Sequence, residues 1–176
     1  MNLWWRLLRR WIVLMRSRPA SLWDEVSVSF TVSPTDLDVL GHMNNGRYLT
    51  LMDLGRYELL KRSGWWERLA ELGWAAVVAG QTITYRRELR LGQRFDLRTR
   101  VLGFDDRWCY LEHRFVVDEV VHAHAVVRGR FVRRAGGTVD IHELEEAVGG
   151  FPDHLRVEPW ITAWTHHTRS PMGSPP

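Results

Sequence analysis

Hydrophobic and polar residues alternate over residues 26–32, where each valine or phenylalanine is followed by a serine or threonine. A period of two is typical of a strand with one buried face, and Pro34 ends it. Between residues 49 and 63 the hydrophobic residues instead recur at helical spacing, and Gly64 is a natural helix stop. The pattern therefore predicts a strand, a loop and a long helix.

The remaining pattern predicts more strands than helices. A short helical turn is expected at residues 65–72, further strands at 74–89, 94–101, 108–117 and 120–133, and helices at 141–148 and 159–164. The strand at 94–101 alternates between apolar residues or threonine and charged residues, so one of its faces is expected to contact water. A strand, a long helix and four more strands form an α+β order, which predicts one antiparallel sheet packed on the long helix.

The chain has 176 residues, enough for one domain with its own hydrophobic core. We assign this domain to residues 24–150 and treat residues 151–176 as a C-terminal extension. The end of the extension, 170–176, is rich in proline and small residues and is expected to be disordered. The single cysteine, Cys109, excludes an intramolecular disulfide. Because it alternates with hydrophobic residues in a predicted strand, we interpret it as a core residue rather than a nucleophile, compatible with a reducing cytoplasm.

The formal net charge of +3 is unevenly distributed, because residues 1–23 carry five arginines, four tryptophans and no acidic residue. On a helix this segment is amphipathic, but its apolar run from Trp11 to Met15 is far too short to cross a bilayer. Residues 1–18 suit contact with an anionic membrane surface, or packing on the domain or a dimer partner, and the sequence leaves both open. We expect a cytoplasmic protein, with any membrane contact peripheral. No nucleic-acid-binding module accompanies the arginines, so no nucleic-acid partner is expected.

Residues 36–48 read Asp-Leu-Asp-Val-Leu-Gly-His-Met-Asn-Asn-Gly-Arg-Tyr and lie at the predicted strand-to-helix junction. The run gathers two carboxylates, an imidazole and two amides where the first backbone N–H groups of a helix lack intrahelical partners. The helix macrodipole adds partial positive charge at the same place. The junction therefore suits stabilisation of an oxyanion.

The pattern Asp-x-Asp-x-x-Gly-His-Met-Asn-Asn-x-x-Tyr resembles the signature of the 4-hydroxybenzoyl-CoA thioesterase branch of the hotdog-fold superfamily. Residues 82–89 and 99–107 are similar to the thioesterase superfamily member 6-like subgroup of that branch, so the resemblance spans about residues 24–135. It implies an α+β hotdog fold, in which a five-stranded antiparallel sheet wraps around a long central helix. It also implies a homodimer and leaves open whether dimers pair into tetramers.

The resemblance further implies a thioesterase that hydrolyses acyl-CoA to free acid and CoA. In such enzymes the second carboxylate of the Asp-x-Asp pair attacks the thioester carbonyl or activates water, and that position here is Asp38. The oxyanion donor is a backbone N–H at the start of the central helix, which by register falls on Asn45, with Gly46 as its neighbour. Asn44, Gly46 and Tyr48 are the expected substrate-binding residues. No metal or cofactor is expected, since coenzyme A enters as part of the substrate.

The same run resembles that of plant acyl-carrier-protein thioesterases, in which an aspartate, an asparagine and a histidine are implicated. This chain keeps Asp38 and His42 but has Leu40 in place of the asparagine. His42 is therefore either a catalytic assistant that exchanges protons near neutral pH or a hydrogen bonder that holds the loop. Two other functions stay open: hydrolysis of acyl-carrier-protein (acyl-ACP) thioesters, and non-catalytic binding of acyl groups or lipids at a membrane surface.

Structural roles compete for each residue of this run. Asp36, after Ser-Pro-Thr, is interpreted as a turn or cap residue, and a loop cap is the alternative to catalysis for Asp38. Asn44 and Asn45 are good helix-capping types, so at least one of their side chains is expected to serve the helix. Tyr48, one turn into the helix, suits packing better than chemistry.

Two further groups contain residue types that commonly bind metals or phosphates. His122 and His124 share one face of a predicted strand, as a metal site would need, but no third ligand is evident. Guanidinium groups match phosphate geometry, and five arginines are considered for the phosphates of coenzyme A. They are Arg86, Arg87, Arg98, Arg128 and Arg130. Most of them are interpreted as a solvated sheet face.

Overall fold

The computed structural model describes residues 18–168, and within them a five-stranded antiparallel sheet of order β1-β3-β4-β5-β2. The strands are β1 (Val26–Thr31), β2 (Trp74–Tyr85), β3 (Arg94–Phe104), β4 (Cys109–Val117) and β5 (Val120–Arg133). The helices are α2 (Asn45–Arg62), α3 (Trp65–Glu71), α4 (Ile141–Val148) and α5 (Pro159–His167), with a 3-10 turn, η1 (Pro34–Asp36), before α2.

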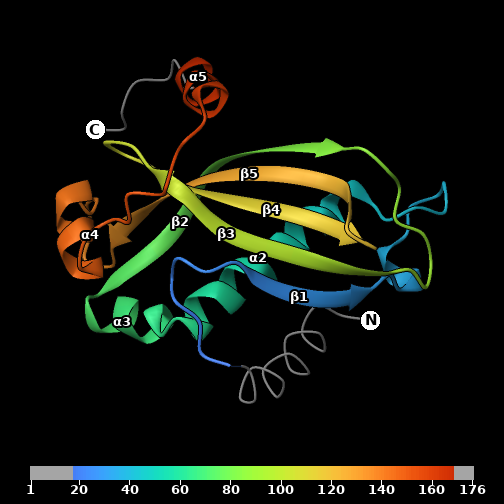
Figure 1. Cartoon of the computed structure of the whole chain (residues 1–176), viewed down its shortest axis with the longest axis horizontal. Helices are drawn as coiled ribbons and strands as arrows, with labels where there is room; N and C mark the ends of the chain where they lie inside the picture. The colour runs from blue at the N-terminus through green and yellow to red at the C-terminus, as the bar shows by residue number, and fades with distance from the viewer. Residues whose placement is uncertain (1–17, 169–176) are drawn as a thin grey trace.

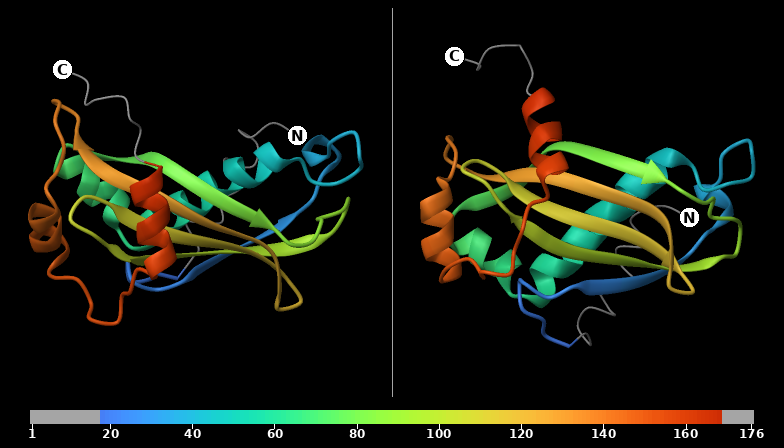
Figure 2. Two further views of the ribbon diagram at one scale, coloured as in Figure 1. Left: turned by 90° about the horizontal axis from the view of Figure 1, so that it is seen from above. Right: turned by 45° about the horizontal axis from the view of Figure 1, so that its top comes forward.

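Helix α2 lies across one face of the sheet, as Figures 1 and 2 show. Tyr48, Leu51, Met52 and Leu54 of α2 are at most 5 % exposed and pack with side chains of β3, β4 and β5. Burial of this apolar stripe is the main stabilising contact between helix and sheet. A sheet wrapped around a long helix confirms the predicted α+β class and the hotdog arrangement.

Gly55 lets α2 approach the sheet closely. A Cβ atom at this position would lie 2.4 Å from Thr99 Oγ1 and 3.0 Å from Leu97 Cδ2, both on β3. Beneath α2, Thr99 Oγ1 and His113 Nδ1 are 2.9 Å apart, and both side chains are fully buried. Glycine inside a helix normally costs up to about 1 kcal/mol relative to alanine. The close contact, rather than helix propensity, explains why glycine stands here.

Helix α5 covers part of the opposite face of the sheet, where Ile161 packs with Trp108 and Tyr110. Arg128 on β5 is only 6 % exposed, lies 5.3 Å from the Trp108 ring centroid, and donates from Nη1 to Thr165 O at 3.0 Å. A cation is favoured at the carbonyl end of a helix. Arg128 is therefore a buried support for α5, and neither role considered for it, a phosphate contact or a place on a solvated sheet face, is correct.

Most predicted elements are present, but several of their ends differ. The strand predicted at 74–89 is wrong at its end: β2 stops at Tyr85, because the N–H groups of Arg86 and Arg87 both donate to His122 O and the chain leaves the sheet. The strand predicted at 94–101 continues to Phe104 and completes β3. The helix predicted at 159–164 continues to His167.

Most of the basic N-terminal segment and the tail predicted to be disordered lie in residues 1–17 and 169–176, outside the described residues. From the remainder of that segment, Ala20, Leu22 and Trp23 pack against the hydrophobic core. None of the helices that the structure describes combines the length and apolar character needed to cross a lipid bilayer.

Candidate active site

The loop between β1 and α2 is folded back on itself by backbone hydrogen bonds. The Asp38 N–H donates to His42 O at 2.9 Å, and the Asn44 N–H donates to Asp36 O at 2.8 Å. Gly41, with a φ of 80°, lies in the reversal between the two arms, a conformation that side chains with a Cβ rarely adopt. The loop therefore places the two aspartates of the motif opposite its histidine and its first asparagine.

Asp36 holds the start of this loop, as predicted. Its Oδ2 accepts hydrogen bonds from the backbone N–H and the hydroxyl of Ser33, each at 2.8 Å. Its Oδ1 lies 3.5 Å from Arg47 Nε, and the residue is 1 % exposed. A carboxylate buried among these donors has a structural role.

Asp38 is half-buried and uses one carboxylate oxygen for the loop. Oδ1 accepts from the backbone N–H groups of Leu40 at 2.9 Å and His42 at 3.4 Å. Oδ2 has no hydrogen-bond partner among residues 18–168. The cap role and a chemical role are therefore compatible, because the second oxygen remains available to a substrate or to water.

Helix α2 begins with Asn44 as its N-cap residue, whose Oδ1 accepts from the Gly46 N–H at 2.8 Å. This confirms that one asparagine side chain serves the helix, and it engages the Gly46 N–H. Asn45 is an exposed residue, and its N–H has no hydrogen-bond partner within the described part of the chain. Asn45 thus presents a free donor at the positive end of an 18-residue helix.

His42 pairs with Glu88 on the loop after β2. His42 Nε2 lies 2.6 Å from Glu88 Oε2, and each side chain is 37 % exposed. Since a carboxylate only accepts, Nε2 carries the proton, which leaves Nδ1 of a neutral ring as an acceptor. Arg90 Nε donates to the other Glu88 oxygen at 2.6 Å. Glu88 was not among the predicted site residues, because its proximity to the motif depends on the path of the chain after β2.

Tyr48 packs inside an aromatic cluster. It is 2 % exposed, and its ring lies edge-on to Tyr85 and Phe115, with centroids 5.0 and 4.8 Å away. Burial raises the pKa of the Tyr48 hydroxyl to about 12, so this group stays neutral. The Tyr85 hydroxyl donates to Asn45 O at 3.4 Å, which links the end of β2 to the start of α2. The structure thus places Tyr48 in the packing beneath the motif.

An apolar cavity of about 200 Å³ lies between the C-terminal half of α2 and the sheet. Its lining includes Leu59 of α2, Trp65 of α3, and Leu144 and Val148 of α4. Cys109 also lines it, is 7 % exposed, and has its thiol pKa raised to about 12 by burial. The thiol is therefore an inert wall residue, which confirms its interpretation as part of the core.

Charged groups also line this mainly apolar cavity. Asp53 and Arg56 form an ion pair, and Arg56 Nη1 lies 3.3 Å from His113 Nε2. Because arginine only donates, His113 Nε2 accepts and Nδ1 carries the proton that faces Thr99. Burial, followed by the nearby Arg56 charge, holds the pKa of His113 well below its usual range. The sequence carries no signal for this chain of contacts, because it forms only when α2 packs on β3 and β4.

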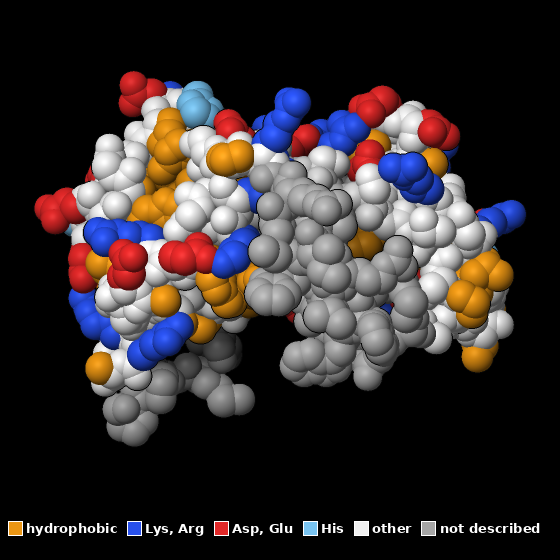
Figure 3. Space-filling model, turned by 90° about the horizontal axis from the view of Figure 1, so that it is seen from below, with side chains coloured by type: hydrophobic (Ala, Val, Ile, Leu, Met, Phe, Trp, Pro, Cys, Tyr) orange, Lys and Arg blue, Asp and Glu red, His pale blue; other side chains and the backbone are white. Residues whose placement is uncertain are grey.

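An open polar hollow of about 470 Å³ lies beside the motif. Its lining residues are Arg87, Glu88, Arg90, Gln93 and His122. The tip of the loop that carries the motif is apolar and open to water, with Val39 102 % and Leu40 73 % exposed. Figure 3 shows hydrophobic side chains gathered towards both ends of the face that carries α3.

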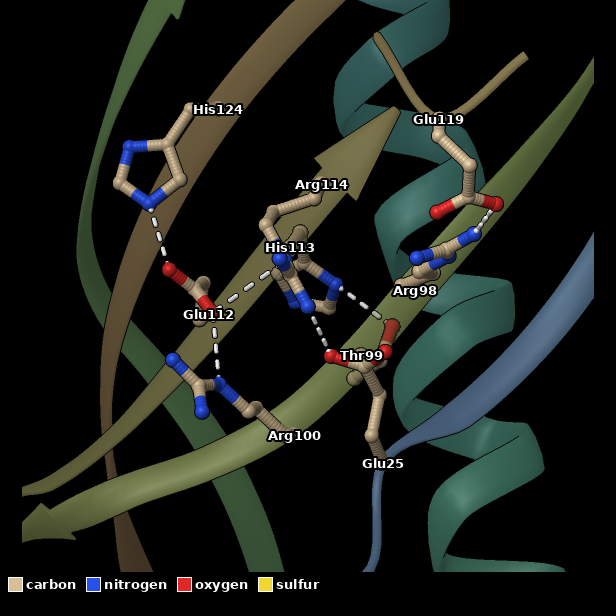
Figure 4. A network of polar contacts seen from close by, with 9 residues as sticks. All are labelled: Glu25, Arg98, Thr99, Arg100, Glu112, His113, Arg114, Glu119 and His124. Carbon is tan, nitrogen blue, oxygen red and sulfur yellow. Dashed lines mark hydrogen bonds and ion pairs between the residues drawn. The ribbon is translucent and has the colours of Figure 1, made fainter. Parts of the chain in front are cut away.

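The face of the sheet away from α2 carries a polar network, seen in Figure 4. Glu112 accepts from Arg100 Nε at 2.7 Å and from His124 Nε2 at 2.9 Å. Burial by itself would raise the pKa of Glu112, but the hydrogen bonds from His124 and Arg100 lower it to about 2. His122 Nδ1 lies 3.0 Å from Glu88 O. Both histidines considered for a metal are thus engaged, and residues 18–168 contain no group of three or more His, Cys, Asp or Glu placed to hold an ion.

The sequence matches a family model described as the thioesterase-like superfamily over residues 32–164. It is 42 % identical over 130 residues to Protein THEM6 of Xenopus laevis, a match that covers 72 % of this chain and 63 % of that protein. The chain therefore spans less than two thirds of the length of this relative.

Solved structures share the fold at lower identity. The probable thioesterase YbaW from Escherichia coli is 22 % identical with a TM-score of 0.65, over 69 % of this chain and 95 % of that one. The BH1999 gentisyl-coenzyme A thioesterase is 20 % identical with a TM-score of 0.59, over 66 % of this chain and 95 % of that one. These similarities support the fold, and the family model extends over most of the chain, including the motif, strands β2 to β5 and most of the cavity walls. The chain belongs to the thioesterase-like superfamily.

Proposed function

We propose that this protein hydrolyses acyl-CoA thioesters to the free acid and CoA, with Asp38 as nucleophile or general base. The observation that carries the proposal is the loop that holds Asp38 just before α2, with Oδ2 unpartnered and the Asn45 N–H free among the described residues. Loss of one oxyanion donor typically costs roughly a hundredfold or more in rate. Membership of the thioesterase-like superfamily and the gentisyl-coenzyme A thioesterase among similar structures support this class of reaction.

The proposed chemistry begins with addition to the thioester carbonyl, either by Asp38 or by a water molecule that Asp38 deprotonates. The Asn45 N–H and the α2 macrodipole then stabilise the oxyanion of the tetrahedral intermediate. His42, oriented by Glu88, is assigned to exchange a proton with water or with the departing sulfur through Nδ1. Collapse of the intermediate expels CoA as the thiol. When water is the attacking group the other product is the free acid, and when Asp38 attacks, the other product is a mixed anhydride on Asp38 that water hydrolyses to the free acid.

Two hollows suit the two arms of such a substrate. Arg87 and Arg90 line the polar hollow beside His42 and Glu88, where guanidinium groups match phosphate oxygens. The apolar cavity suits a hydrocarbon chain, at about 0.8 kcal/mol per buried methylene. Its first lining residue on α2, Asp53, lies about 12 Å along the helix from Asn45. We therefore assign the coenzyme to the motif end of α2 and the acyl end to the cavity.

The proposed assembly is a homodimer formed through β2. Within residues 18–168 this 12-residue edge strand pairs with β5 on one side and with no strand on the other. Val77 and Val78 on it are 38 % and 47 % exposed and also line the cavity. Pairing of two such edges would remove unpaired backbone groups from water and place the partner beside the cavity opening.

The test is release of free thiol from an acyl-CoA series by wild type, Asp38→Asn and Asp106→Asn. Asp106 is exposed on the turn after β3 and is the matched carboxylate control. We expect turnover to fall by at least about a hundredfold in Asp38→Asn alone, with its melting temperature retained. Equal turnover by Asp38→Asn and wild type would show that another residue does the chemistry.

Absence of turnover on acyl-CoA leads to the two alternatives, which differ in what they predict. Hydrolysis of acyl-carrier-protein thioesters instead would make that carrier the partner. Turnover with neither carrier, together with binding to anionic vesicles that requires residues 1–18, would support a non-catalytic acyl- or lipid-binding domain at a membrane surface.

A further inference from the structure

We propose that α4 is the stop that limits the length of the acyl chain this protein accepts. This inference rests on the proposed function and concerns the closed end of the apolar cavity, which is remote from the motif. Leu144 and Val148 of α4 line the cavity, and Leu144 is 4 % exposed. A side chain that ends a pocket determines how far a ligand can enter it.

The exposed and buried lining residues show which end of the cavity is open. Asp53, the lining residue of α2 nearest the motif, has a side chain that is 70 % exposed, and Val77 and Val78 on the β2 edge are 38 % and 47 % exposed. Leu144 lies instead in a buried cluster with Leu69 and Trp74. In Figure 1, α3 and α4 lie together at the end of the sheet where β2 begins and β5 ends. An acyl chain whose thioester lies at the motif and which enters past Asp53 therefore meets α4 at the far wall.

The size of the cavity is limited. A cavity of about 150 Å³ lined by aliphatic and aromatic side chains holds benzene. By proportion, the volume of about 200 Å³ found here holds the last roughly eight carbon atoms of a chain. Further methylenes would have to displace Leu144 or stay outside.

Helix α4 is held firmly enough to act as a stop. Its N-cap residue, Asp140, accepts from the His142 backbone N–H at 2.9 Å, and Glu143 forms an ion pair with Arg133 on β5. The Val139 N–H donates to Phe131 O at 3.0 Å, which ties the chain just before α4 to the end of β5. A helix held both at its N-cap and by an ion pair to β5 resists displacement by one extra methylene of the ligand, because overpacking forces side chains off their rotamers.

The experiment measures kcat/KM for an even-numbered acyl-CoA series from acetyl to palmitoyl in wild type, Leu144→Ala and Val148→Phe. Leu144→Ala deletes three carbon atoms from the closed end, so the longest efficient substrate should gain two to three carbons. Each extra buried methylene is worth roughly fourfold, so kcat/KM should rise at least about tenfold for the first chain length that wild type rejects. Val148→Phe should shorten the limit by a similar number of carbons.

Leu69→Ala is the matched control. Leu69 is 5 % exposed and packs in the same cluster as Leu144, but it does not line the cavity. Leu69→Ala should lower the melting temperature much as Leu144→Ala does. Its dependence of kcat/KM on acyl-chain length should be the same as that of wild type. If Leu144→Ala does not fold, Val148→Ala, at a half-buried position on the same wall, takes its place.

The outcomes separate this proposal from the proposed function. An unchanged profile in folded Leu144→Ala and Val148→Phe, or an equal shift in Leu69→Ala, overturns the stop while leaving hydrolysis intact. If wild type hydrolyses no acyl-CoA, the proposed function fails, and the stop is tested by binding of saturated fatty acids of increasing length. The same lengthening of the preferred acid in Leu144→Ala would then support α4 as the stop, and its absence would refute it.

Discussion

His113 should make the stability of this protein fall in mild acid. The ring is fully buried beneath Gly55 and lies between Thr99 Oγ1 and Arg56 Nη1, at 2.9 and 3.3 Å. Burial and the Arg56 charge hold its pKa well below the usual 6.5, so the folded protein keeps the ring neutral. The unfolded chain, in contrast, takes up a proton as the pH falls through 6.5.

The sign of the effect follows from which state binds the proton. Above pH 6.5 neither the folded nor the unfolded state protonates His113, so this residue makes no pH-dependent contribution to the free energy of unfolding. Below it the unfolded state binds more protons, so the free energy of unfolding decreases with falling pH until the folded pKa is reached. With the folded ring kept neutral over this range, the loss due to this one residue is about 2 kcal/mol between pH 7.5 and pH 5.

The assay is urea unfolding of wild type and His113→Asn at several pH values across that range. At pH 7.5 the variant should be less stable by about 1–3 kcal/mol, because Arg56 loses an acceptor in a buried place. As the pH is lowered, the stability of the variant should fall less steeply than that of wild type. The difference in the free energy of unfolding between the two should therefore have decreased by about 2 kcal/mol at pH 5. His154→Asn, which removes an exposed imidazole, should keep the slope of wild type.

Parallel curves for wild type and His113→Asn would refute this reasoning. They would mean that the folded protein protonates His113 as readily as the unfolded chain does. A slope change of the same size in His154→Asn would equally show that the effect does not arise from burial.

Two further predictions concern the contacts around α2. Gly55→Ala should lower the free energy of unfolding by about 1–3 kcal/mol, because its Cβ would lie 2.4 Å from Thr99 Oγ1. Urea unfolding measures this difference, and a variant more stable than wild type would disprove the close approach of α2 to β3. Glu88→Gln should reduce kcat/KM several-fold and alter its pH profile, because it weakens the group that orients His42. Its melting temperature should change little, since a half-exposed ion pair contributes at most about 1 kcal/mol; an unchanged pH profile would remove His42 from the proposed chemistry.

Local spacing in the sequence was enough to predict the order of the elements and the position of the motif. The alternation at 26–32 and the helical period after residue 49 depend on which side chains share a face, and that is set by the geometry of a strand or a helix. That one of Asn44 and Asn45 caps the helix could be predicted for the same reason, since the partner, the backbone of Gly46, lies two residues from the Asn44 that makes the bond. These contacts need no knowledge of the rest of the fold.

The end of β2 and the partner of His42 were decided by the tertiary structure. The strand stops at Tyr85 because the carbonyl of His122, on a different strand, accepts from the next two N–H groups. The loop that follows then carries Glu88 to His42. Side-chain periodicity gives no information about either contact, because the residues involved belong to different elements.

The cavity and its closed end were also decided by the tertiary structure. The sequence assigned Cys109 to the core and predicted a helix at 141–148, and both are confirmed. That Leu144 lies across the end of a cavity between α2 and the sheet depends on how α4 folds back beside α3 after β5. The hydrophobic pattern determined which side chains leave water, whereas packing of the elements determined the space left between them, because that space depends on distances between segments remote in the sequence.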